Sequence, residues 1–338
     1  MKKRLSNLEL LRIVSMFLIV LGHTTWQTKF SYSTMPLAHK VSIQSLWIGG
    51  EMGVWAFTLI SAYFLSTSNF KRRALKNIWG LTLFYSIAIY LILVFTNTAP
   101  LNFKFSLKSF LPVLTGNYWY VSAYIGMYIL IPFSNKLIRE MNKKEYNIFI
   151  IILFVMLSLL PYLKNITVVT NNNSIFNLLY IYFIGGYIKK YKEDFSKANM
   201  KYYILTFILS VILMILSITI LDIIRPKSWS AFLTTSSPLE AIAGISLFLI
   251  FKNIDIKHSK FINTIAASTF AVYLIHCQTV FFPILWGKII RAQQYENSSY
   301  IIIYEILIAI IIYIVATIID LIRREIVGLF KTQVMKRD

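Results

Sequence analysis

Long apolar runs separated by short, basic polar segments dominate the pattern along the chain. Many of these runs are about 17 to 25 residues long, the length at which an apolar helix crosses a bilayer. They predict ten membrane spans, at residues 8–28, 46–66, 76–97, 118–135, 147–164, 175–188, 202–222, 236–251, 264–286 and 299–322. The sixth and eighth runs contain the fewest residues. The pattern therefore predicts an all-α integral membrane protein with about ten transmembrane helices.

The Lys and Arg residues between the runs predict how the spans are oriented. With the amino terminus inside the cell, 24 of the 34 basic residues fall in cytoplasmic segments and nine in outer ones, while Arg12 lies within the first span. Every cytoplasmic segment carries more basic residues than any outer segment, as the positive-inside rule requires. We therefore expect both termini in the cytoplasm. Residues 1–338 are expected to form one domain, because no loop is long enough to join a second.

Composition agrees with a multi-pass membrane protein, since 57% of the residues are hydrophobic and only 14% are charged. The formal net charge of +20 comes from short basic clusters between the apolar runs, so we expect no nucleic-acid partner. Cys277 is the single cysteine and lies in an apolar run, so we expect no intramolecular disulfide and no metal site. The amino terminus resembles a signal peptide, but no small-residue cleavage site follows its apolar run, and we expect a retained helix.

The first span carries ionisable residues where charge is costly. A helix turns about 100° per residue, so Arg12 and His23 return to within about 20° of each other, and Glu9 lies about 40° to one side. Ionisable groups at membrane depth usually face a bundle interior or a water-filled cavity and mark a functional site. Arg12 and His23 are therefore candidate catalytic residues. Glu9 either joins them or only pairs with Arg12 at the cytoplasmic end.

The second span contributes one acidic residue and ends in a basic cluster. Glu51 and His23 are each about five residues from the outer end of their spans, so a carboxylate–imidazole pair between them is geometrically possible. The alternative is that Glu51 lies in an outer vestibule without contacting His23. The cluster Lys71, Arg72 and Arg73 follows the span on the cytoplasmic side. It either binds the phosphates of a nucleotide-containing donor or only follows the positive-inside rule.

Further polar and aromatic residues lie in the later spans. Trp119 is placed at the outer interface, and Tyr124 either lines a carbohydrate cleft or packs between helices. Tyr273 and His276 lie almost one turn apart in the ninth predicted span, so a second intramembrane histidine supports a polar interior. In the last span we expect Asp320 to pair with an arginine at the cytoplasmic edge, Arg323 or Arg324.

Several of these motifs together resemble the membrane acyltransferase family 3, bacterial O-acyltransferases of surface polysaccharides. The resemblance rests on Asn7-x-Glu9-x-x-Arg12 followed by ten residues and His23, on Ser-Ala-Tyr-Phe-Leu-Ser at 61–66, on Trp119-Tyr120 with Tyr124 and Pro132, on Ser237-Pro238, and on Tyr-Leu-Ile-His at 273–276. It spans nearly the whole chain, in order. One departure is Ala62, where the family usually has glycine; the added methyl would crowd a close approach of backbone or ligand there.

The resemblance implies transfer of an acyl group, most often acetyl, from cytoplasmic acetyl-CoA to a sugar hydroxyl at the outer face of the bacterial cytoplasmic membrane. Acetyl-CoA would then be a co-substrate, with no permanently bound cofactor, and the partners would be the lipid bilayer and a polysaccharide or lipid-linked sugar. Arg12 and the basic cluster would bind the donor. His23 would act either as general base or as a covalent acyl carrier. The candidates for acceptor or oxyanion binding are Glu51, Ser61, Tyr63, Trp119, Tyr124, Tyr273 and His276.

Two other functions use the same features differently. A polysaccharide or lipid-linked glycan exporter would use the polar interior as a path, and it would need neither the fixed spacing between Arg12 and His23 nor an acyl-CoA. A membrane scaffold of a cell-envelope synthesis complex would tolerate substitution of both residues. Loss of acyl groups with intact polymer export in a His23→Ala variant would distinguish the transferase from both.

Overall fold

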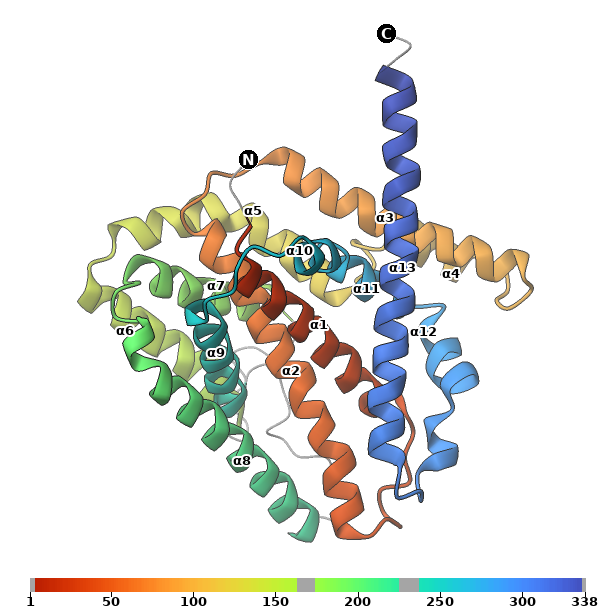
Figure 1. Ribbon diagram of the computed structural model, residues 1–338, viewed down its shortest axis with the longest axis horizontal. Coiled ribbons are helices and arrows are strands. Elements are labelled where there is room, and N and C mark those ends of the chain that lie inside the picture. Colours follow the sequence, from red (N-terminus) through yellow and green to blue (C-terminus); the bar gives the residue numbers. More distant parts are fainter. Residues whose placement is uncertain (1–3, 163–173, 225–236, 336–338) are drawn as a thin grey trace.

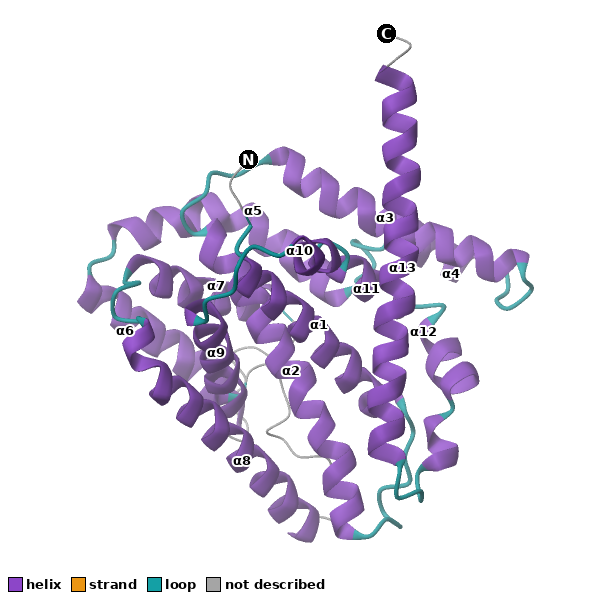
Figure 2. Ribbon diagram, in the orientation of Figure 1, coloured by secondary structure: helices purple, strands orange, loops and turns teal. Residues whose placement is uncertain are grey.

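Every regular element that the structure describes is a helix (Figures 1 and 2). The computed structural model describes residues 4–162, 174–224 and 237–335. Its longest helices are α1 (Ser6–Gln27), α2 (Leu37–Leu65), α3 (Arg72–Phe95), α5 (Trp119–Glu140), α8 (Met200–Ile224) and α13 (Ile301–Met335). The shorter ones are α4 (Phe103–Phe110), α6 (Lys143–Phe154), α7 (Ile175–Lys190), α9 (Pro238–Asn253), α10 (Lys260–Ala266), α11 (Thr269–His276) and α12 (Phe282–Ile284). The prediction of an all-α protein is confirmed.

Six helical segments within the described ranges are long and apolar enough to cross a membrane. They are Ser6–Gln27, Leu37–Leu65, Arg72–Phe95, Trp119–Glu140, Lys197–Ile224 and Ile301–Leu329. The outer surface of α8 is formed by apolar side chains that remain about half exposed, including Leu205, Leu209 and Leu213. Contiguous apolar surface of this kind is stable against lipid and costly in water. The protein is a multi-pass membrane protein.

The other predicted spans also contain helices, but these are shorter or interrupted. Helices α7 and α9 have 16 residues each, which is below the length of a perpendicular span. Helix α6 has 12 residues and continues through a π-turn (Val155–Leu159) and a 3₁₀ turn (Leu160–Tyr162). The predicted ten spans therefore remain a prediction for these segments.

The ninth predicted span, 264–286, is not one helix. Helix α10 ends at Ala266 and α11 begins at Thr269, and a turn at Ala267 and Ser268 separates them. The hydroxyl of Thr269 donates to the carbonyl of Ala266 at 2.9 Å, a local bond that competes with continuous helix. Helix α11 then ends at His276, so this residue lies at a helix terminus inside the bundle.

Helices α1 and α2 lie side by side at the centre of the bundle (Figure 1). The contact is made by glycines: a Cβ on Gly22 would lie 2.7 Å from Cα of Gly50, and a Cβ on Gly53 would lie 2.5 Å from the carbonyl oxygen of Ser15. Small residues at such positions let two membrane helices approach at backbone distance. Because Gly22 faces Gly50, their neighbours His23 and Glu51 lie at the same level of the two helices.

The beginning of α1 and the later part of α13 meet at the same end of the bundle. Arg4 donates to the carbonyl of Asn263 at 3.4 Å, and Arg324 donates to the carbonyl of Thr264, also at 3.4 Å. Asp320 accepts from Arg323 at 2.7 Å, which confirms the expected ion pair. The side of the membrane on which this end lies remains a prediction.

Candidate active site

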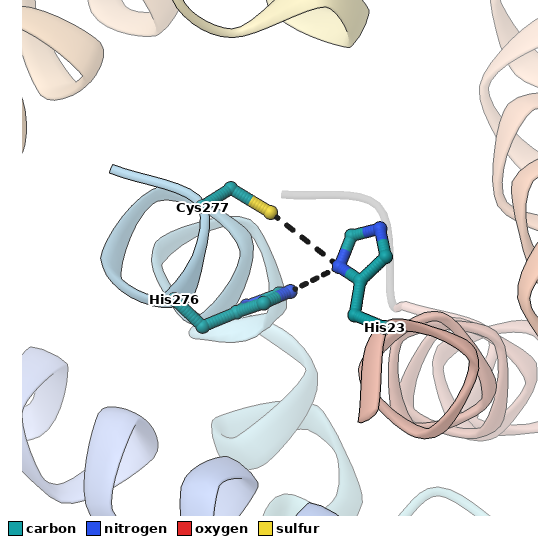
Figure 3. Close-up of side chains that lie close together, drawn as sticks. All are labelled: His23, His276 and Cys277. Carbon is teal, nitrogen blue, oxygen red and sulfur yellow. Dashed lines mark hydrogen bonds between the residues drawn. The ribbon is translucent and has the colours of Figure 1, made fainter. Parts of the chain in front are cut away.

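His23 lies near the end of α1 and faces the end of α11 (Figure 3). Its Nδ1 is 3.0 Å from Nε2 of His276 and 3.6 Å from Sγ of Cys277. The ring of Phe282 meets the His23 ring edge to face, with centroids 6.0 Å apart. The two histidines are 253 positions apart in the sequence, and the broken helix α10–α11 brings them together.

The hydrogen bonds of His276 fix which nitrogen of His23 carries a proton. Nδ1 of His276 lies 2.6 Å from the carbonyl oxygen of Val272, which can only accept, so this nitrogen must be the donor. In a neutral imidazole the other nitrogen, Nε2, then bears the lone pair and accepts from Nδ1–H of His23. It follows that Nε2 of His23 carries a free lone pair. This nitrogen can take a proton or attack an electrophile.

Glu51 does not orient His23 through Nδ1, because His276 holds that nitrogen. Glu51 lies within electrostatic range of a second carboxyl group, that of the fully buried Glu240 of α9. The depth of Glu51 in the membrane remains a prediction, and the structure gives His276 as the hydrogen-bond partner of His23 Nδ1.

Arg12 lines a cavity of about 380 Å³ at the end of the bundle where α1 begins. Arg4 shares this wall, and Glu9 lies 3.7 Å from both guanidinium groups. Two cations against one carboxylate leave a net positive wall. Ser61 and Tyr124 line the same cavity, so Ser61 of the Ser-Ala-Tyr motif faces the space beside Arg12.

A second, smaller cavity of about 30 Å³ adjoins the first cavity and is lined by His23. Trp119 and Tyr273 line it together with His23. The two cavities share three wall residues, Phe57, Tyr120 and Phe270. Arg12 and His23 thus lie along one interrupted passage that follows the polar face of α1, as the spacing on the first span predicted.

Other predicted site residues lie outside both cavities. Lys71, Arg72 and Arg73 are exposed at the start of α3, although the Lys71 carbonyl accepts from the hydroxyl of Tyr128, one turn beyond Tyr124. Tyr63 packs against the ring of Phe248. These residues belong to the surroundings of the site.

The methyl group of Ala62, where the family usually has glycine, packs against a neighbouring helix and not toward the site. Ala62 is fully buried, and its methyl group faces Gly185 of α7: a Cβ on that glycine would lie 2.5 Å from the methyl carbon. The added methyl therefore occupies space that a glycine on the neighbouring helix leaves open. It does not crowd the cavity lined by Ser61.

Four site residues were missed by sequence reasoning. Phe57, Tyr120 and Phe270 form the constriction between the cavities, and Cys277 contacts His23. Cys277 directly follows the Tyr-Leu-Ile-His box, which was the available signal. Tyr120 follows Trp119 in one of the motifs that carry the family resemblance, whereas Phe57 and Phe270 carry no signal that separates them from ordinary core residues.

One group of side chains in the described part of the chain could hold a metal ion. The ligand atoms of His23, His276 and Cys277 all lie within 4.8 Å of one another. Imidazole and thiolate are the ligands of zinc and of soft cations. A cation bound to Nδ1 of His23 would replace the proton in the bond to His276, so it would compete with the hydrogen-bonded arrangement described above.

Comparison with known families now identifies the chain. The family model described as an acyltransferase domain matches residues 5–320, nearly the whole chain. The chain belongs to acyltransferase family 3. No curated protein and no solved structure matches it significantly, so the family model alone carries this assignment. The matched range of this membrane acyltransferase includes Arg12, His23 and His276.

Proposed function

We propose that this acyltransferase moves an acetyl group from cytoplasmic acetyl-CoA to a hydroxyl group of a cell-surface polysaccharide sugar at the outer face of the bacterial cytoplasmic membrane. The observation that carries the proposal is the passage along α1, with Arg12 on the wall of one cavity and His23 on the wall of the next. An anion-binding group and a nucleophilic nitrogen on one passage are what transfer from an anionic thioester requires.

The cavity lined by Arg4 and Arg12 is the proposed donor site. Acetyl-CoA carries several phosphate charges, and guanidinium groups bind phosphate through bidentate, charge-assisted hydrogen bonds. Glu9, 3.7 Å from both arginines, holds them on this wall while leaving it net positive. Lys71, which is exposed near this end, and its two basic neighbours add to the positive field that attracts the donor.

His23 is the proposed reacting group, through Nε2. As general base, Nε2 takes the proton of the sugar hydroxyl while the hydroxyl oxygen attacks the thioester carbonyl. The C–S bond then breaks, and CoA leaves as a thiolate that takes up the proton from Nε2. As carrier, Nε2 itself attacks the carbonyl, the C–S bond breaks and CoA leaves as a thiolate. In a second step the sugar hydroxyl attacks the acyl group, the C–N bond to the imidazole breaks, and the hydroxyl proton that is released balances the thiolate charge. In both routes Nδ1–H donates to His276 and stabilises positive charge on the ring.

The small cavity beside His23 favours a short acyl group. About 30 Å³ holds two or three water-sized volumes, which suits acetyl better than succinyl or longer chains. Tyr273 lines this cavity and is the proposed hydrogen-bond donor to the oxyanion, because both ring nitrogens of His276 already have partners. Trp119, on the same wall, would pack against the acyl group or the sugar.

The direct test uses the purified full chain in lipid vesicles with acetyl-CoA labelled on the acetyl group. We expect release of CoA and transfer of label to surface polysaccharide, both abolished by His23→Ala. Label that stays on the protein without acceptor, and is lost in His23→Ala, would support the carrier over the base. Transport of a glycan with no CoA release would instead support an exporter.

The donor site has its own matched comparison. Arg12→Gln removes a charge from the cavity wall, whereas Lys71→Gln removes an exposed charge outside it. We expect the first variant to raise the KM for acetyl-CoA about tenfold or more and the second to raise it less than about threefold. Equal effects of the two variants would contradict the proposed donor site.

A further inference from the structure

A third cavity, of about 590 Å³, lies at the opposite end of α1 from Arg12. It is formed by the end of α1 and the segment that runs from α12 through a π-turn (Leu285–Ile290) and a 3₁₀ turn (Ala292–Tyr295). Its polar wall is made by Gln27, Lys29, Trp286, Arg291, Gln293 and Gln294. The volume is that of a typical small-molecule site.

The wall of this outer cavity is basic and rich in amides. Lys29 and Arg291 supply two positive charges, and no carboxylate is among its lining residues in the described part of the chain. Each glutamine amide offers both hydrogen-bond donors and acceptors, the pattern that pairs with sugar hydroxyls. The wall therefore fits a ligand that is rich in hydroxyl groups and also carries negative charge.

Trp286 adds an unsatisfied donor to this wall. The residue is 3% exposed, and its Nε1–H is buried without a hydrogen-bond partner. An unpaired buried donor costs about 1–3 kcal/mol, so such groups are rare and usually meet a ligand or water. Because Trp286 lines the cavity, an oxygen atom of a bound ligand would satisfy this donor.

The outer cavity is separated from His23 by one aromatic ring. Phe282 lines the cavity and packs edge to face against His23, with centroids 6.0 Å apart. It packs in the same way against Trp286, at 6.1 Å. A rotation of the Phe282 side chain would therefore open a direct path from the outer cavity to the reacting imidazole.

The backbone that carries these side chains is irregular where the cavity is built. Leu285–Ile290 forms a π-turn, and Arg291 follows it in the left-handed region at φ +52°. π-turns and left-handed residues other than glycine cost free energy and cluster at functional sites. In this case the irregular turn directs both Trp286 and Arg291 to the same cavity.

We propose that the outer cavity binds the acceptor, and that the acceptor is an acidic polysaccharide whose carboxylate or phosphate groups lie against Lys29 and Arg291. The inference rests on the proposed acetyl transfer and adds the chemical class of its second substrate. The negative group is held at the basic wall, a sugar oxygen accepts from Trp286, and a neighbouring hydroxyl reaches His23 past Phe282.

The experiment offers fractionated acceptors to the full-length protein in vesicles. Surface polysaccharide from cells lacking this chain is separated by anion exchange into neutral and acidic fractions, and each is supplied with labelled acetyl-CoA. Portions of the acidic fraction are first treated to reduce carboxylates or to remove phosphates, which distinguishes the two sources of charge. The KM for acetyl-CoA is measured in parallel, because it reports the donor site whether His23 acts as base or as carrier.

Three variants and one control test the wall itself. We expect label in the acidic fraction and its loss after one of the two treatments. Lys29→Gln and Arg291→Gln should each lower kcat/KM for the acidic acceptor about tenfold or more, with the KM for acetyl-CoA unchanged. Trp286→Phe keeps the ring and removes the donor, so it should raise the KM for the acceptor severalfold. Lys288→Gln is the control, since this exposed lysine lies in the same π-turn and outside the cavity wall.

Other results would overturn the proposal in distinguishable ways. Label in the neutral fraction, or equal effects of Arg291→Gln and Lys288→Gln, would refute the acidic-acceptor site while acetyl transfer stands. CoA release with label in neither fraction would refute a polysaccharide acceptor. Absence of both CoA release and label would refute the proposed function as well.

Discussion

The hydrogen bond between His276 and His23 makes a quantitative prediction about the reacting imidazole. His276→Ala removes the acceptor of Nδ1–H and leaves His23 without the partner that selects its tautomer. The proton can then lie on Nε2, where it blocks both proton uptake and attack on a thioester. The structure thus predicts that His276 is a positioning residue, acting through His23.

The size of the effect follows from the geometry. In His276→Ala the donor left without its acceptor is Nδ1–H of the partly buried His23, and an unpaired donor of this kind costs about 1–3 kcal/mol. At about 1.4 kcal/mol per factor of ten, the fraction of His23 with a free lone pair on Nε2 falls about 5- to 150-fold. We expect kcat to fall by that factor, with the KM for acetyl-CoA nearly unchanged because the donor cavity is remote from His276.

The assay compares His276→Ala with His276→Gln at matched protein levels in vesicles, following CoA release and acetyl transfer. A glutamine can place its side-chain carbonyl near the position of Nε2 and accept from Nδ1–H of His23. We therefore expect it to recover most of the lost kcat, a rescue that a purely packing role of His276 would not produce. Wild-type kcat in His276→Ala, or equal losses in the two variants, would refute the reasoning.

The remaining predictions concern the donor wall and the stability of the bundle. Arg12→Gln should raise the KM for acetyl-CoA without changing the melting temperature, measured beside Lys71→Gln in the same vesicles. Gly22→Val would push α1 away from α2, because even a Cβ would lie 2.7 Å from the facing backbone, so we expect less folded protein in the membrane and a lower melting temperature. Lys40→Met breaks a buried ion pair in which Nζ of Lys40 lies 3.0 Å from Oδ1 of Asp222 and neither side chain is more than 3% exposed. It should destabilise the protein by about 3–5 kcal/mol while the folded fraction keeps its KM for acetyl-CoA; an unchanged denaturation midpoint would contradict this.

The polar face of the first helix, which carries Arg12 and His23, could be predicted from the sequence because it depends only on helical periodicity. Arg12 and His23 were placed on one face by their spacing, and they line two adjoining cavities along α1. The similar depth of His23 and Glu51 was predicted in the same way. The partner of His23 was not, because depth gives no information on how one helix is rotated about its axis relative to another.

Features that depend on contacts distant in sequence could not be predicted. His276 reaches His23 only because the ninth apolar run breaks at Ala267 and Ser268, and periodicity does not distinguish a broken apolar run from a continuous one. The packing of Ala62 against Gly185 also joins two helices far apart in the chain. Hydropathy predicted where apolar helices occur, but it did not predict the break between α10 and α11.

The most direct test of acetyl transfer by the first helix is the ester-linked acyl content of cell-surface polysaccharide. It should be measured in cells that make the wild type, His23→Ala or Arg12→Ala at matched membrane levels. The account predicts that acylation disappears in the first variant and falls sharply in the second, with the amount of surface polymer unchanged. Unchanged acyl content together with loss of polymer from the surface would contradict the transferase and support an exporter.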